Sequence, residues 1–137
     1  MKTLALRLHP GDDLKASLDS FVSTQHLSAA CVVTCVGSLG RAVLRFADQE
    51  DPSTLQGKFE IVSLTGVLSV HGSHCHIAIA DSKGRTTGAH LLEGCLVYTT
   101  AEIVLLALDD YVFLRSFDEQ TSYLELEIQP LSYRREI

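Results

Sequence analysis

Hydrophobic and polar residues alternate along most of this chain, which is the pattern of β-strands that bury one of their two faces. The alternation is strict at 123–128, where leucine or isoleucine at 124, 126 and 128 alternates with glutamate at 125 and 127. The pattern predicts strands at 3–8, 29–36, 41–46, 59–70, 74–80, 85–87, 95–108, 111–117 and 123–128. The stretch 95–108 has the length of a helix, but its β-branched residues favour a strand, interrupted around Ala101 and Glu102.

One segment has helical spacing instead. Between residues 14 and 26 the apolar side chains recur every three or four positions and form one stripe: Leu14, Leu18, Phe21 and Val22. Asp12 or Asp13 can cap the amino end of this helix, which we expect to end near His26. A helix followed by many strands predicts an α+β fold with a mostly antiparallel sheet.

Glycines are expected to separate several of these strands. The segment Gly37-Ser38-Leu39-Gly40 is predicted to interrupt the chain with a bulge or tight turn, and Gly66 to allow a bend or bulge. Exposed loops are predicted at 48–56 and 88–94. The Gly37 segment has neither the lysine nor the spacing of a phosphate-binding loop, and no helix follows it. Nucleotide binding of that type is therefore not expected.

Composition limits the function classes. The 137 residues suit one domain, which we place at 1–131, with a C-terminal tail at 132–137. Eleven basic residues against seventeen acidic ones give a net charge of −6, so direct binding of duplex DNA is not expected. The chain shows no membrane-spanning apolar stretch and no secretion signal, which predicts a cytoplasmic protein with no membrane association.

Three histidines are the candidate metal ligands. His74 and His76 are two residues apart in a predicted strand, so both side chains share one face, and His90 follows from a nearby turn. Three imidazoles with an open fourth position are typical of a catalytic or exchangeable zinc, and another divalent transition metal would also fit. Cys75 would point to the opposite face. The alternative interpretation is that the histidines are polar residues that face water near a sheet edge.

No nucleophile with its base is recognisable, because no serine or cysteine stands in a diagnostic context. Of the two acidic residues Asp81, which lies in a predicted turn, and Glu102, the second is the better candidate for a catalytic group. It lies inside an apolar strand, where an acid is costly unless it is paired or exposed, so it is a candidate general base or hydrogen-bond partner of a histidine ligand. The alternative for Glu102 is a glutamate that faces a sheet edge or an interface.

Several segments resemble one family. The segment from Gly57 to Gly66 reads Gly-Lys-Phe-Glu-Ile-Val-Ser-Leu-Thr-Gly and resembles the plants and prokaryotes conserved (PPC) domain, whose plant members carry Gly-Arg-Phe-Glu-Ile-Leu-Ser-Leu-Ser-Gly. The likeness continues at Asp81–Gly88, similar to that family's Asp-Gly-Arg-x-x-Gly turn, and at 8–13 and 37–38. It covers almost the whole chain, from residue 2 to residue 131.

The resemblance implies an antiparallel sheet flanked by helices and a homotrimer. Plant members carry an Arg-Gly-Arg-Pro segment that enters the DNA minor groove. This sequence has no such segment, and it resembles the prokaryotic type, with histidines at 74, 76 and 90. The family's DNA-binding label therefore has no support in these residues.

Two function classes remain open. The first is a small trimeric module that binds a metal and interacts with a protein partner or a small ligand. The second is a small zinc-dependent enzyme, or a metal or ligand sensor, that uses the three histidines. The sequence identifies no substrate.

Overall fold

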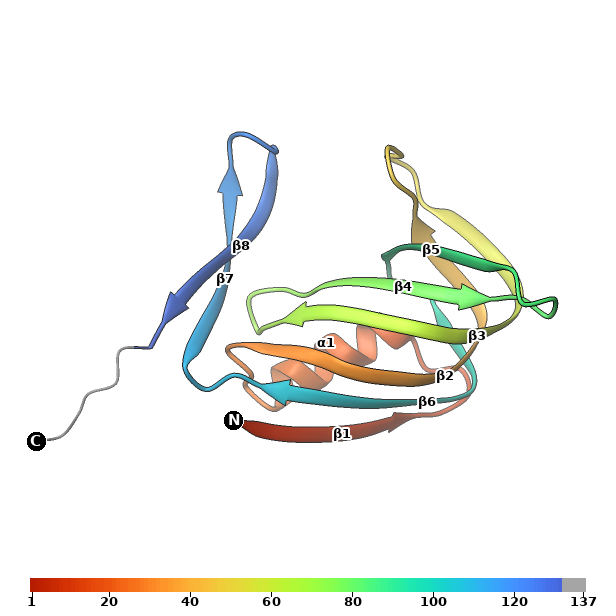
Figure 1. The fold of residues 1–137 in the computed structure, drawn as a ribbon, viewed down its shortest axis with the longest axis horizontal. Helices are drawn as coiled ribbons and strands as arrows, with labels where there is room; N and C mark the ends of the chain where they lie inside the picture. Colours follow the sequence, from red (N-terminus) through yellow and green to blue (C-terminus); the bar gives the residue numbers. More distant parts are fainter. Residues whose placement is uncertain (132–137) are drawn as a thin grey trace, which may run out of the picture.

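The computed structural model describes residues 1–131, and the tail predicted at 132–137 lies outside the described residues. Figure 1 shows a twisted sheet, one helix behind it and a hairpin that projects from it. The elements are β1 (Lys2–Leu8), α1 (Leu14–Thr24), β2 (Ala30–Arg45), β3 (Ser53–Leu68), β4 (His74–Ala80), β5 (Thr86–Leu91), β6 (Leu96–Ala107), β7 (Tyr111–Asp118) and β8 (Tyr123–Pro130).

The main sheet has the strand order β1-β6-β2-β3-β4-β5, and each pair is antiparallel. The last strand also pairs with the end of β2, where Leu44 lies opposite Leu91 and Arg45 opposite His90. The pairings β2–β3, β3–β4, β4–β5 and β5–β2 therefore form a closed circuit. This pairing covers the end of the free edge of β5, at residues 90 and 91, and fixes which of its residues lie beside β2.

Helix α1 covers one face of the sheet, as predicted from its apolar stripe. Leu14, Leu18 and Val22 are fully or almost fully buried, and the core continues into the sheet through residues such as Leu105 and Ile79. Asp13 is the N-cap, as expected for one of the two candidates. The resemblance implied flanking helices in the plural, but α1 is the one helix that the described residues contain.

The glycines at 37 and 40 do not break the strand. Strand β2 runs through them for 16 residues, and its register against β6 shifts on either side of Leu39. Bulges of this kind were predicted, but the interruption of the strand was wrong. The pairing partner explains the difference: Gly37 lies against the backbone of Thr100 and Ala101, so a small residue is needed for close approach.

Three predicted loops or interruptions are also corrected. The expected loop at 48–56 ends at Ser53, where β3 begins, and the expected loop at 88–94 is strand as far as Leu91. Strand β6 continues without interruption past Ala101. In each case the residues that were expected in a loop or an interruption pair with a neighbouring strand. This pairing outweighs the local preference of their side chains for a turn.

Strands β7 and β8 form a separate hairpin, which rises away from the sheet in Figure 1. Its base is anchored: Phe113 is buried, its N–H donates to the carbonyl of Ser28, and its carbonyl accepts from the Ser69 hydroxyl. No helix in residues 1–131 is long and apolar enough to cross a membrane.

Candidate metal centre

The three predicted ligands come together on neighbouring strands. His74 and His76 lie on the same face of β4, and His76 is directly opposite His90 of β5. His90 was expected in a loop that follows a turn, but it lies within β5. Directly paired residues of antiparallel strands present their side chains on the same face, with Cβ atoms about 5 Å apart. Strand pairing therefore brings the third imidazole to the first two.

The distances suit a shared metal ion. The Nε2 atoms of His74 and His76 are 3.1 Å apart, and the possible ligand atoms of all three histidines lie within 4.8 Å of one another. Two nitrogens bound to one tetrahedral zinc at the usual bond length are separated by about 3.3 Å. His74 and His76 already meet that spacing. The remaining separations are at most 4.8 Å.

The surroundings of His74 and His90 lower the pKa of both imidazoles. Burial lowers the pKa of His90 to about 4, and the nearby positive charges of His74 and Arg45 act in the same direction. Burial also lowers the pKa of His74, followed by the charge of His76 and of Arg115. A metal binds the neutral form of histidine, so these shifts reduce the competition from protons at neutral pH.

Cys75 points away from this face, as predicted. Its side chain is 2% exposed, and burial raises the pKa of its thiol to about 11. A Cβ on Gly66 would lie 2.6 Å from the Cys75 Sγ atom, closer than such atoms approach. Gly66 was predicted to allow a bend or bulge, but the register of β3 against β4 is regular there. Its lack of a side chain instead makes room for the Cys75 thiol behind the histidines.

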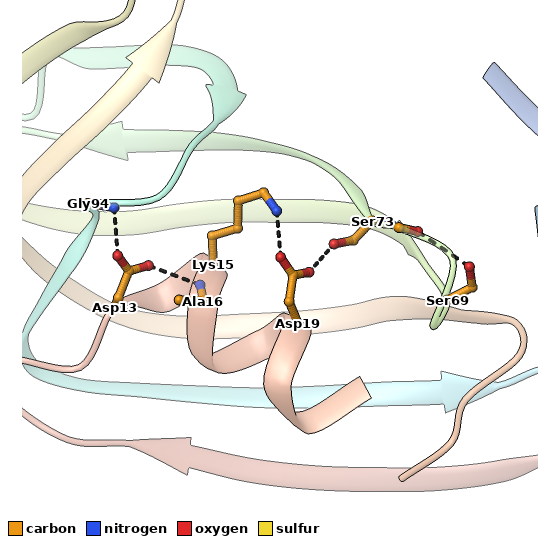
Figure 2. Close-up of polar contacts among 8 residues, drawn as sticks. Asp13, Lys15, Ala16, Asp19, Ser69, Ser73 and Gly94 are labelled. Atoms are coloured by element: carbon orange, nitrogen blue, oxygen red, sulfur yellow. Dashed lines mark hydrogen bonds and ion pairs between the residues drawn. The ribbon is translucent and has the colours of Figure 1, made fainter. Parts of the chain in front are cut away.

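The segment before His74 is held by the helix. Figure 2 shows the Ser73 hydroxyl donating to the carboxylate of Asp19, which also forms an ion pair with Lys15 at 2.6 Å. The Ser69 hydroxyl, at the start of the same turn, donates to the carbonyl of Phe113 at 2.8 Å. These contacts connect the start of β4 to α1 and to the hairpin, and they position His74 relative to both.

Two pockets adjoin the histidines. The first has a volume of about 520 Å³ and is lined by His74, His76 and His90 together with the chain that follows β2. The second has a volume of about 670 Å³ and lies between the histidines and the β7–β8 hairpin. His74, His90 and Arg45 line both pockets. A ligand of small-molecule size could therefore reach the candidate metal from either side.

Glu102 lies apart from this cluster. It is exposed on β6, opposite Arg7 of β1, and lines neither of the two pockets. The carboxylate that does line the second pocket is that of Glu125, on β8. Glu125 was not predicted from the sequence. The alternation in β8 shows which face of the hairpin carries Glu125, but the position of the hairpin relative to the histidines depends on the tertiary structure.

The comparisons agree with the resemblance drawn from the sequence. A family model described as the Plants and Prokaryotes Conserved (PCC) domain matches residues 1–109. The bifunctional protein GlmU of Synechococcus sp. (strain JA-2-3B'a(2-13)) is 48% identical over 132 residues, which are 96% of this chain and 21% of that protein. The chain therefore spans about a fifth of the length of the curated relatives it matches.

Solved structures show the same fold. A hypothetical protein from Salmonella enterica is 40% identical, with a TM-score of 0.92 and 94% coverage of both chains. A metal-containing protein from Archaeoglobus fulgidus is 29% identical, with a TM-score of 0.81 over 93% of this chain and 94% of the other. Two structures described as candidate DNA-binding proteins, from Bacteroides thetaiotaomicron and Ralstonia eutropha, are 19% and 20% identical, which shows the fold alone.

Proposed function

Because the chain belongs to the Plants and Prokaryotes Conserved domain family, we propose that it is a small homotrimeric module that binds a divalent transition metal through His74, His76 and His90. The observation that carries this proposal is the cluster of three imidazoles with ligand atoms within 4.8 Å. Zinc is the expected ion, because three neutral imidazoles suit it and leave one position open. The metal-containing relative from Archaeoglobus fulgidus supports the proposal.

Metal analysis of protein purified without a metal-affinity tag tests this directly. We expect one zinc per chain after dialysis against zinc and then against buffer. The His76→Ala variant should bind zinc roughly a hundredfold more weakly, since a four-ligand zinc site is worth about 10–16 kcal/mol, or about 3 kcal/mol per ligand. His9→Ala is the matched control, because His9 is exposed at the end of β1 and lies outside the cluster. Full zinc content in His76→Ala would contradict the assignment.

The homotrimer is proposed from apolar surface that the described residues leave uncovered. In the described part of the chain, β7 and β8 pair with each other alone. Outside the pocket beside the histidines, more than half of the surface of several large apolar side chains is exposed, on the hairpin and on the main sheet: Ile128, Val33, Val36 and Val62. Exposed apolar surface of this extent is typical of a subunit interface.

Sedimentation equilibrium at micromolar concentration tests the assembly. The expected mass is three times the 15.0 kDa of one chain. Ile128→Asp should shift the distribution toward smaller species, because it places a charge on the exposed apolar side of β8. A wild-type monomer at this concentration would contradict the proposal.

A small zinc-dependent enzyme, or a sensor of a metal or ligand, is the second candidate function. The observation that favours it is the position of the two pockets, which lie on either side of the histidines. A metal whose fourth position opens into a pocket can bind a ligand or activate water. A metal-dependent turnover that is lost in His76→Ala would favour this function over a module that only interacts with partners.

Direct binding of duplex DNA is not part of the proposed function. The net charge of −6 gives these residues no general attraction for phosphates.

A further inference from the structure

An arginine stands next to the histidines in the same row of the closed sheet. Arg45 of β2 is directly opposite His90 of β5, and His90 is directly opposite His76 of β4. Residues paired in this way share one face, so the guanidinium of Arg45 projects from the face that holds the imidazoles. The closure of β5 onto β2 produces this arrangement.

A second arginine approaches from the hairpin. Arg115 of β7 lines the pocket between the hairpin and the histidines, together with Arg45, His74 and His90. The turn before β4 accommodates it, because a Cβ on Gly72 would lie 3.3 Å from Cγ of Arg115.

Neither guanidinium has a partner within residues 1–131. Among these residues, Arg45 and Arg115 make no ion pair and no side-chain hydrogen bond, whereas Arg85 pairs with Asp81. The pocket contains one carboxylate, that of Glu125, which accepts a hydrogen bond from Thr121. Two unpaired cations against one carboxylate leave the pocket positive, and a divalent metal would increase that charge.

The remaining walls of this pocket are partly apolar. Phe117, Tyr123 and Leu124 of the hairpin line it, and each is more than 60% exposed. The volume of about 670 Å³ is in the range of small-molecule sites. A ligand here would meet positive charge at the histidine end and aromatic side chains at the hairpin end.

We infer that this pocket binds a small organic anion, whose carboxylate or phosphate group lies between the metal and the guanidiniums of Arg45 and Arg115. Its apolar part packs against Phe117 and Tyr123. Guanidinium groups hold such oxyanions by paired hydrogen bonds, and the open position of the metal accepts one oxygen. The inference rests on the proposed metal site and names the ligand class of that same site.

Calorimetric titration of the zinc-loaded full chain tests it, with benzoate, acetate and inorganic phosphate as probes. We expect benzoate to bind more tightly than acetate, because only benzoate reaches the aromatic side chains. Binding of phosphate without binding of benzoate or acetate would assign the site to phosphate groups, and the reverse result would assign it to carboxylates. Arg45→Gln and Arg115→Gln should each weaken binding by about tenfold or more, as expected for a lost charge-assisted hydrogen bond, with zinc content unchanged. Arg85→Gln is the matched control and should bind as the wild type does.

The outcomes separate this inference from the proposed function. Absence of zinc in the wild-type protein would overturn both. Stoichiometric zinc with no binding of any probe, or with equal binding by the wild type and both arginine variants, would overturn the anion site and leave the metal site standing. Equal affinity for benzoate and acetate would contradict the proposed contact of the ligand with Phe117 and Tyr123.

Discussion

The contact between β2 and β6 at Gly37 offers a sharp test of how closely these strands pack. A Cβ added to Gly37 would lie 2.1 Å from the carbonyl oxygen of Thr100 and 2.7 Å from Cα of Ala101. Both neighbours are backbone atoms of the paired strand, so no side chain can rotate out of the way. A Cβ added to Gly40, three residues later on the same strand, would meet nothing closer than 4.0 Å.

The two distances set the expected cost of Gly37→Ala. A carbon and an oxygen that are not bonded approach to about 3.3 Å, so the strands would have to separate by about 1 Å. That separation weakens one or two ladder hydrogen bonds, worth about 1 kcal/mol each, and adds about 1–3 kcal/mol of overpacking strain. We expect a loss of about 3–4 kcal/mol, a large share of the 5–15 kcal/mol that is typical of a domain.

Urea unfolding at one fixed protein concentration measures both variants. Gly40→Ala is expected to be neutral or to stabilise by less than about 1 kcal/mol, because it only restricts the unfolded chain. The free energies of unfolding of the two variants should therefore differ by about 3 kcal/mol or more. A difference below about 1 kcal/mol would refute the close approach of β2 and β6 at this point.

Three further outcomes are expected. Asp13→Ala should cost about 2–3 kcal/mol in urea unfolding, because the Asp13 carboxylate accepts from the N–H groups of both Ala16 and Gly94, and loss of this cap leaves both donors without a partner. The backbone N–H groups of Lys83 and Arg85 donate to the Asp81 carboxylate and lower its pKa below its usual value of 3.8. The stabilisation is therefore present above that value and is lost as the pH falls through the lower pKa of the folded state. The urea midpoints of wild type and Asp81→Asn should differ by a constant amount above pH 5 and converge below pH 4. In a gel-shift assay at about 150 mM salt the protein should not retard duplex DNA at submicromolar concentration, and a sequence-selective shift would contradict this.

Sequence periodicity was sufficient for those features that depend on neighbours along the chain. The spacing of Leu14, Leu18 and Val22 predicts the buried face of α1, and the capping preference of aspartate predicts its start. Alternation in the His74–Ala80 strand places two histidines on one face and Cys75 on the other. These are consequences of the helical and extended repeats themselves, and tertiary context did not change them.

Glycines were less reliable as predictors of turns and loops, because a glycine can either permit a turn or permit the close approach of a neighbouring strand. Gly37 and Gly40 suggested an interruption, and Gly88 suggested a loop, yet all three lie within strands. At Gly37 the reason is the backbone of the partner strand, which the local sequence does not contain. A glycine that permits close approach and a glycine that permits a turn look the same until the partner is known.

The candidate site also contains some residues whose positions follow from the strand repeat and others whose positions depend on the tertiary structure. The sequence by itself determined that His74 and His76 form a pair, since a strand repeats every two residues. Only the tertiary structure decided that His90 lies opposite His76, that Arg45 lies opposite His90, and that the hairpin carries Arg115 to the same pocket. Those positions depend on register and on the closure of β5 against β2, and a register shift of one residue would turn these side chains to the other face. Such long-range pairings are set by the packing of the whole sheet, and for this reason local sequence patterns did not reveal them.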